Sequence, residues 1–250
     1  MREETLFISD LHLSAERPET VERFLKLCKN RILGARRLYI LGDLFDAYLG
    51  DDNHDYPFGP VKKVLKRLTR AGTEVYFLPG NRDFLVGEGF SKETGVLLLG
   101  DYEVIELGPS LALLTHGDLL CTDDIQYQAA RIKVRSAEWR AYALGKPLWL
   151  RKLYARWYRY KSGLDKRGKT LEIMDVNEAA VLEAFRTFKV TRLIHGHTHR
   201  AQLHQLVVDD VAVERHVLPE WDGHEWLVVF DHDGHRQEPI DMQASTAQST

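Results

Sequence analysis

The sequence predicts an α+β fold, a four-layer α/β/β/α sandwich in which two β-sheets pack face to face between outer helices, with an inserted helical hairpin. In the first half of the 250-residue chain, short apolar runs typical of strands alternate with amphipathic helical segments. Near the end, strand-like runs follow one another directly, as in antiparallel sheets. We expect one domain over residues 1–240, a helical insertion at about 123–170 within it, and a polar tail at 241–250.

The individual elements follow from the spacing of apolar residues. Strands are expected at residues 5–9, 37–41 and 74–78, and helices near 18–32 and 60–70, where apolar residues recur three or four positions apart. Further strands are expected near residues 96–99, 103–107, 111–115, 191–195, 202–208, 211–217 and 225–231. A last helix is expected over MDVNEAAVLEAFRTF, with Asp175 or Asn177 as its N-cap.

Five short blocks of metal-ligand residue types follow the apolar runs. The blocks contain Asp10 and His12; Gly42 and Asp43; Gly80, Asn81, Arg82 and Asp83; His116 and Asp118; and Gly196, His197 and His199. Loops that follow buried strands lie at one edge of a sheet, so these side chains should meet in one pocket. Any single block could be structural, as a helix cap or a buried histidine. Five of them in this order predict a site for two divalent metal ions.

The ligand types narrow the chemistry of this site. Carboxylate, imidazole and amide oxygen suit Mn²⁺, Mg²⁺, Fe²⁺ or Zn²⁺, and the absence of thiolate argues against a closed structural zinc site. A carboxylate such as that of Asp43 can bridge two ions about 3.5–4 Å apart, the spacing of two-metal hydrolysis. Such a pair lowers the pKa of a shared water and neutralises a phosphoryl group during attack. The sequence therefore predicts a metal-dependent hydrolase.

Composition argues against several other classes of protein. The two cysteines, Cys28 and Cys121, have no zinc-knuckle or disulfide-framework spacing, which favours a reducing, cytoplasmic compartment. The N-terminus is charged at once and already contains a ligand block, so we expect no signal peptide. No apolar stretch approaches the roughly 18–20 residues that span a bilayer. Any membrane association is therefore expected to be peripheral.

Positive charge is concentrated in the expected insertion. Residues 128–170 hold thirteen Lys or Arg against Glu138 and Asp165, whereas the whole chain has a net charge of −3. The same segment is rich in Trp, Tyr and Leu. A cationic, amphipathic hairpin suits a substrate with phosphates at one end and acyl chains at the other, or an anionic membrane face. A lid whose aromatic side chains pack on the body and a surface that stacks nucleic-acid bases are the alternatives.

The order D-x-H, GD, GN-x-D, H-G-D and GH-x-H resembles that of the calcineurin-like metallophosphoesterases, over most of residues 5–231. The resemblance implies two metal sites that share Asp43. One would be formed by Asp10, His12, Asp43 and His199, and the other by Asp43, Asn81, His116 and His197. The residues expected to carry the reaction are Asp43, Asn81, Arg82 and His116.

Arg82 occupies a position where many members of that superfamily have a histidine able to protonate a departing alkoxide. Arginine does not donate a proton usefully, but it can clamp phosphate oxygens in bidentate fashion. A phosphate leaving group needs no such acid, since its second pKa is about 6. Arg82 therefore favours cleavage of a phosphoanhydride; the alternative is a surface arginine paired with Asp83.

A narrower resemblance, to the UDP-2,3-diacylglucosamine hydrolase family of lipid A synthesis in Gram-negative bacteria, rests on ISDLHLS, LGDLFDAYLGDD, LPGNRDFLVG, LTHGDLLCTDD, IMDVN and IHGHTHR. It implies attack of Mn²⁺-activated water on the α-phosphorus of UDP-2,3-diacylglucosamine, giving UMP and 2,3-diacylglucosamine 1-phosphate. It also implies a peripheral protein on the cytoplasmic face of the inner membrane, with neither nucleic acid nor an obligate protein as partner. A soluble nucleotide pyrophosphatase or phosphodiesterase and a non-catalytic binding module are the alternatives.

Residues expected to contact this substrate fall in the metal blocks and in the insertion. The family pattern implies contacts from Asn81, Arg82, Asp124, Ser162, Lys166, Lys169 and His197. Tyr127 lies one helical turn beyond Asp124, and this spacing predicts that it lines the same pocket. The acyl chains would lie between aliphatic side chains of the hairpin and the body of the protein.

Overall fold

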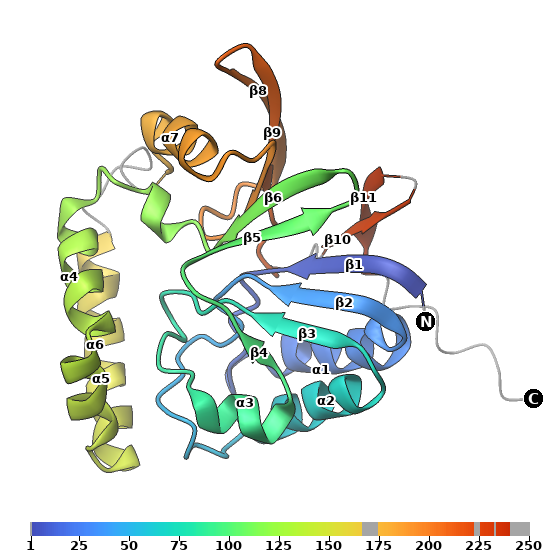
Figure 1. The fold of residues 1–250 in the computed structure, drawn as a ribbon. Coiled ribbons are helices and arrows are strands. Elements are labelled where there is room, and N and C mark those ends of the chain that lie inside the picture. The colour runs from blue at the N-terminus through green and yellow to red at the C-terminus, as the bar shows by residue number, and fades with distance from the viewer. Residues whose placement is uncertain (1, 167–174, 223–225, 233, 241–250) are drawn as a thin grey trace, which may run out of the picture.

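The computed structural model describes the backbone of residues 2–166, 175–222, 226–232 and 234–240, and the side chains of these residues apart from 158–166. Two sheets form the centre, and helices cover the outer face of each (Figure 1). The predicted four-layer α/β/β/α sandwich is confirmed. The polar tail expected at residues 241–250 lies outside the described residues.

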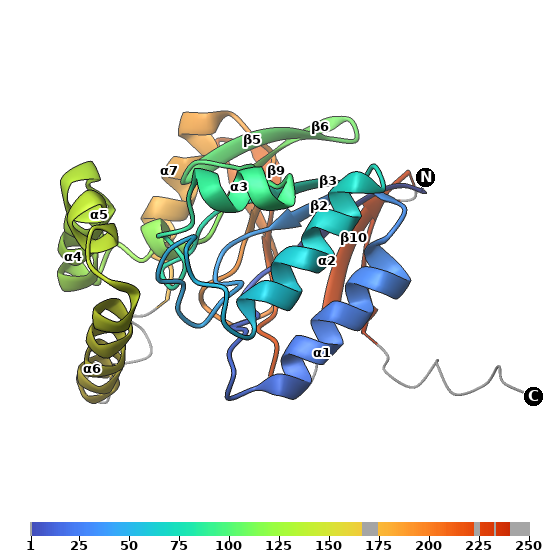
Figure 2. The ribbon, with the colours of Figure 1, turned by 90° about the horizontal axis from the view of Figure 1, so that it is seen from below.

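The first sheet has the strand order β11-β10-β1-β2-β3-β4. Its parallel strands are β1 (Arg2–Ile8), β2 (Ala35–Ile40), β3 (Glu74–Phe77) and β4 (Leu97–Leu98). Two antiparallel strands extend it beyond β1, namely β10 (Trp226–Asp231) and β11 (Gly234–Pro239). Its outer face is covered by α1 (Pro18–Leu27), with a π-helical continuation at Cys28–Ile32, by α2 (Phe58–Arg70) and by α3 (Glu88–Thr94) (Figure 2).

The second sheet has the strand order β5-β6-β7-β9-β8. Its strands are β5 (Tyr102–Leu107), β6 (Ser110–Thr115), β7 (Arg192–His195), β8 (Gln202–Val208) and β9 (Val211–Val217). One helix, α7 (Glu178–Phe188), packs on its outer face. Of the two N-caps considered for this helix, Asn177 is the one observed, because its side chain accepts a 3.1 Å hydrogen bond from the backbone of Ala180.

Apolar side chains fill each interface between layers. Phe24, Phe45 and Phe90 are fully buried between the first sheet and its helices, and Phe7 and Leu114 are buried between the two sheets. Burying one such side chain stabilises the fold by about 1.5–3 kcal/mol. The interfaces thus hold β1, β2, β3, β6 and β7 rigidly, and the polar blocks follow directly where these strands end.

Up to residue 166, where its described part ends, the insertion contains three helices rather than the two expected: α4 (Ile125–Arg135), α5 (Ala137–Leu144) and α6 (Leu148–Lys166). Ser136 has extended backbone angles, which end α4, and its side chain accepts a 3.2 Å hydrogen bond from Trp139, which caps α5. The three helices lie beside the sandwich (Figure 1). Among the helices that the structure describes, none is both long enough and apolar enough to span a bilayer.

Candidate metal centre

The ligand blocks adopt unusual backbone conformations. Asp10, His12, Asp43, His197 and His199 all have positive φ angles, between 48° and 70°. Non-glycine residues in the left-handed region cost about 1–3 kcal/mol each and cluster at functional sites. The tight turns that follow β1, β2 and β7 therefore fix where these five side chains point.

Two glycines allow the blocks to approach one another. A Cβ atom at Gly80 would overlap the carboxylate and backbone of Asp43, and one at Gly196 would overlap the side chains of Ser9 and Asp10. Glycine is therefore required at both positions, because any side chain there would occupy the space of a metal-ligand carboxylate.

The first group of ligand atoms comes from the loops after β1 and β7. Ligand atoms of Asp10, His12 and His199 all lie within 4.8 Å of one another. Nε2 of His199 is 3.4 Å from Oδ1 of Asp10, and Nε2 of His12 is 4.0 Å from Oδ2 of Asp43. These four residues are those expected to share one metal ion.

The second group lies on the other side of Asp43. Nε2 of His116 is 3.7 Å from Oδ1 of Asp43, 3.0 Å from Oδ1 of Asn81 and 3.2 Å from Nδ1 of His197. Nδ1 of His116 faces the backbone carbonyl of Leu41 at 2.9 Å, an interaction in which it donates and leaves Nε2 free as a ligand. The carboxylate of Asp43 thus has one oxygen toward each group.

The buried charges of this centre are poorly balanced by the protein alone. Burial and neighbouring carboxylates raise the pKa of Asp43 to about 6 and that of Asp83 to about 7. Oδ1 of Asp10 is buried and has no hydrogen-bond partner. Burial lowers the pKa of His12 to about 4 and that of His197 to about 3, which keeps both rings neutral. Crowded carboxylates beside neutral imidazoles fit divalent metal ions, which would compensate the buried negative charge.

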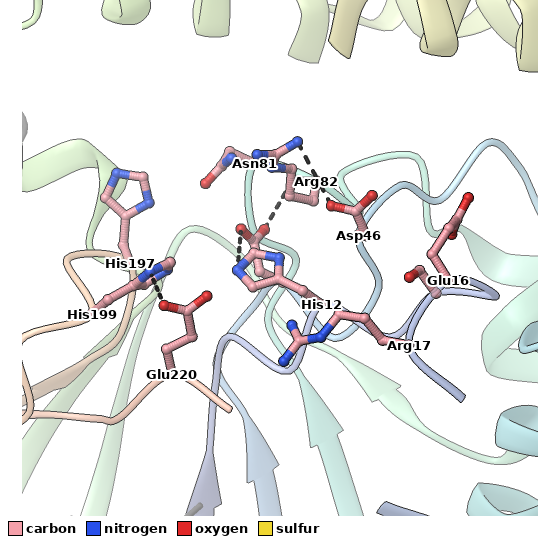
Figure 3. Close-up of a pocket in the computed structure, with 11 residues that line it drawn as sticks. His12, Glu16, Arg17, Asp46, Asn81, Arg82, His197, His199 and Glu220 are labelled. Atoms are coloured by element: carbon pink, nitrogen blue, oxygen red, sulfur yellow. Dashed lines mark hydrogen bonds and ion pairs between the residues drawn. The ribbon is translucent and has the colours of Figure 1, made fainter. Parts of the chain in front are cut away.

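Glu220, in the loop between β9 and β10, was not among the expected site residues. Its Oε2 lies 2.6 Å from Nδ1 of His199, on the side of the ring away from the ligand group (Figure 3). Although burial opposes protonation of His199, its contacts with Asp10 and Glu220 raise its pKa to about 10 in the metal-free protein. Glu220 follows β9, but Glu214, Arg215 and His216 interrupt the apolar run of that strand, so the pattern that marked the five blocks did not identify Glu220.

Arg82 lines the cleft above the ligands and does not pair with Asp83. Its Nη1 lies 3.9 Å from Oδ1 of Asp46, and its backbone N–H donates to Asp43 at 2.8 Å. Asp83 is fully buried and accepts hydrogen bonds from the backbone of Gly80 (2.8 Å) and Phe45 (3.2 Å). The alternative of a surface Arg82–Asp83 pair is therefore wrong, and the guanidinium faces the cleft (Figure 3).

The cleft has a volume of about 540 Å³ and opens directly onto the ligand groups. Its walls are formed by His12, Ser14, Glu16, Arg17, Asp43, Asp46, Asn81, Arg82, His197, His199 and Glu220. Six of the expected site residues, from the loops after β1, β2, β3 and β7, therefore face one cavity.

Asp118, the carboxylate of the fourth block, connects the centre to the insertion. It is buried and accepts hydrogen bonds from Tyr127 Oη (2.5 Å) and Arg131 Nε (2.6 Å) of α4. Arg135 of the same helix donates to the carbonyls of Pro79 (3.1 Å) and Gly80 (2.9 Å), next to Asn81. The first helix of the insertion is thus attached to two ligand loops.

The expected substrate contacts within the insertion are placed only in part. Asp124 is the N-cap of α4 and accepts a 3.1 Å hydrogen bond from the backbone of Tyr127, whose ring lies 6.2 Å from that of His197. The side chains of Ser162 and Lys166 on α6, and all of Lys169, lie outside the described residues.

Comparison with known proteins agrees with this geometry. The sequence profile of the calcineurin-like phosphoesterases matches residues 4–201. A UDP-2,3-diacylglucosamine hydrolase from Haemophilus influenzae is 46% identical over 215 residues, which cover 86% of this chain and 89% of the relative. A relative of the same name from Marinobacter nauticus is 42% identical, over 89% of this chain and 91% of the relative. Another, from Yersinia pseudotuberculosis, is 43% identical, over 87% of this chain and 90% of the relative. The chain belongs to the calcineurin-like phosphoesterases and, within them, to the UDP-2,3-diacylglucosamine hydrolase family.

Proposed function

We propose that the protein hydrolyses the pyrophosphate bond of UDP-2,3-diacylglucosamine in lipid A synthesis, giving UMP and 2,3-diacylglucosamine 1-phosphate (lipid X). The observation that carries this proposal is the position of Asp43, whose two carboxylate oxygens face separate ligand groups beneath a cleft that Arg82 lines. The names of relatives at 42–46% identity supply the substrate.

Two divalent ions, Mn²⁺ by the family pattern, would be held by Asp10, His12, Asp43 and His199 and by Asp43, Asn81, His116 and His197. When bound, such ions supply hydroxide near neutral pH and neutralise charge on the phosphoryl group. The chain's own contribution is to hold the ligands in place through tight turns, buried backbone contacts and the Glu220 carboxylate. The loop after β3 adds Asn81 and Arg82 beside the reacting phosphate.

Arg82 would bind non-bridging oxygens of the pyrophosphate. The guanidinium presents parallel donors that match phosphate geometry and hold the substrate in line for attack on the α-phosphorus. The leaving group is a sugar phosphate, so the site needs no acid at the position of Arg82. His197, which lines the same cleft, would contact the substrate as well as a metal ion.

The insertion would act as a lid that binds the sugar and acyl chains, within a single domain over residues 1–240. Trp149, Leu153 and Trp157 on α6 are 67%, 59% and 54% exposed, which is unusual for side chains of this size. Exposed apolar side chains among Lys and Arg suit the anionic, cytoplasmic face of the inner membrane, where the substrate resides. Asp124, Tyr127, Ser162, Lys166 and Lys169 would contact the substrate from this lid.

The test compares UMP release from the diacylated substrate and from deacylated UDP-glucosamine, both with Mn²⁺. We expect strong preference for the diacylated substrate, and we expect EDTA to abolish activity. Replacing Trp149 and Trp157 with Ser should remove the preference, whereas Trp226→Ser, at an exposed tryptophan of β10, should retain it. Equal turnover of both substrates by the wild-type protein would instead support a soluble nucleotide pyrophosphatase.

A further inference from the structure

A separate cluster of metal-ligand side chains lies outside the catalytic cleft, where the two sheets meet. Glu214 and His216 belong to β9 of the second sheet, and His235 belongs to β11, the edge strand of the first sheet. Ligand atoms of these three residues all lie within 4.8 Å of one another. We call them the rim cluster.

Strand geometry explains why the three side chains converge. Glu214 and His216 are two positions apart on β9, so they share a face, and Leu218, two positions further, packs in the core between the sheets. His235 is directly opposite Phe230 in the β10–β11 ladder, so its ring stands on the same face as that buried phenyl group. The ring of His216 contacts both, at centroid distances of 5.4 Å to Phe230 and 4.7 Å to His235.

The donor set and its spacing suit a zinc ion. Two imidazoles and one carboxylate, with no thiolate, form an open zinc site that leaves a fourth position for water. Zinc holds such ligands at about 2.0–2.2 Å, so ligand atoms around a tetrahedral ion are roughly 3.4 Å apart. Nε2 of His216 and Oε2 of Glu214 already lie 3.3 Å apart. The remaining adjustment falls on His235, whose side chain is exposed.

Neighbouring groups hold the two β9 ligands in place. Arg192 donates to Glu214 at 3.1 Å and to the carbonyl of Leu107 at 3.2 Å, which fixes the carboxylate as outer partners of metal ligands commonly do. His216 is only 5% exposed, and its ring packs against Phe230, so it is held facing the cluster.

We propose that Glu214, His216 and His235 bind one zinc ion that links the two sheets, in addition to the ions of the catalytic centre. The proposal does not depend on the catalytic substrate. The alternative that would overturn the zinc site is a polar cluster that binds no metal, in which Glu214 only pairs with Arg192.

The test measures zinc stoichiometry in the untagged, full-length protein by titration against a chromophoric chelator. His235→Gln should lose one equivalent of zinc, or bind that zinc ion more than about 10-fold more weakly. Loss of a residue that only hydrogen-bonds a metal ligand already lowers metal affinity about 10–100-fold, and loss of the ligand itself should cost at least as much. The matched control is His204→Gln: His204 pairs with Arg215 in the β8–β9 ladder and therefore stands on the opposite face of the sheet, so its zinc stoichiometry should equal that of the wild type.

Two further readouts separate the rim cluster from the catalytic centre and from misfolding. Mn²⁺-dependent activity should be unchanged in His235→Gln, because the exposed side chain lies outside the cleft, and retained activity shows that the variant is folded. Zinc should raise the thermal unfolding temperature of the wild type more than that of His235→Gln. Equal stoichiometry and equal zinc-induced shifts in wild type, His235→Gln and His204→Gln would overturn the proposal.

Discussion

Nδ1 of His199 lies 2.6 Å from Oε2 of Glu220, while Nε2 of the same ring lies 3.4 Å from Oδ1 of Asp10. The two nitrogens of the ring therefore face different carboxylates, one within the ligand group and one outside it. A carboxylate that accepts the second N–H of a ligand histidine fixes its tautomer and orientation. Glu220 is thus a positioning residue for His199.

Glu220→Ala should weaken the binding of one metal ion about 10–100-fold, the usual effect of losing such a partner. Glu220→Gln should lose less, because its amide oxygen can still accept the hydrogen bond. Calorimetric titration of the metal-free protein with Mn²⁺ measures both. Glu16→Gln is the control, since Glu16 is an exposed carboxylate that lines the same cleft. Wild-type affinity in Glu220→Ala would contradict the positioning role.

Arg82→Ala should lower kcat/KM for the diacylated substrate about 10–100-fold, because a hydrogen bond to a charged group contributes about 1.5–3 kcal/mol. Arg82→Lys should recover part of this loss, since it keeps the charge but not the bidentate geometry. The control is Arg186→Ala, which removes an exposed arginine of the outer helix α7 that pairs with Asp209. A kcat/KM of Arg82→Ala equal to that of the wild type would show that the guanidinium does not bind the substrate.

Asp118→Asn should lower the free energy of unfolding by about 1.5–3 kcal/mol, because it removes one charged partner from the Arg131 guanidinium, which is only 8% exposed and keeps its hydrogen bonds to Asp101. Denaturant unfolding measures this loss, and amide exchange should show earlier opening of α4 than of the sheets. Asp209→Asn, which breaks the exposed pair with Arg186, should cost less than about 1 kcal/mol. Similar small losses for both variants would show that Asp118 does not attach the insertion.

Stability should fall in acid partly through Glu4 of β1. Burial opposes ionisation of Glu4, but hydrogen bonds from Arg31 and Arg2 outweigh it and lower the pKa below the ordinary value of 4.5. The unfolded chain therefore binds this proton more readily than the folded protein. The contribution of Glu4 is fully present above about pH 4.5 and is lost as pH falls through the folded-state pKa.

Urea unfolding of the EDTA-treated protein between neutral pH and pH 3 checks this effect without interference from metal release. The wild type should lose stability more steeply than Glu4→Gln below about pH 4.5, the ordinary pKa of the group. Parallel profiles for the two proteins would show that Glu4 is not responsible.

The sequence was sufficient for the layers and for the ligand groups, because both depend on local patterns. Apolar runs predicted the buried strands. The residues that follow β1, β2 and β3 lie at one edge of the first sheet, those that follow β6 and β7 lie at one edge of the second, and side chains from the two edges meet in the ligand groups. The positive φ angles of Asp10 and Asp43, which aim these carboxylates, have no sequence signal beyond the adjoining polar residues.

Features that depend on tertiary contacts were missed. Strand β11, GHRQEP, is a polar edge strand without an apolar run, and α3 has only one turn of buried residues around Phe90. Glu220 reaches His199 from the loop after β9, a strand whose apolar run is interrupted by polar residues. Asp118 was grouped with the metal blocks, whereas its carboxylate is engaged by Tyr127 and Arg131, an arrangement that depends on where the insertion folds back.

The proposed function depends above all on attack of a metal-activated water on the α-phosphorus of UDP-2,3-diacylglucosamine. Hydrolysis in ¹⁸O-labelled water with Mn²⁺, followed by mass spectrometry of both products, tests it most directly. We expect one labelled oxygen in UMP, none in 2,3-diacylglucosamine 1-phosphate, and no product from Asp43→Asn. Label in the sugar phosphate, or undiminished turnover by Asp43→Asn, would contradict it.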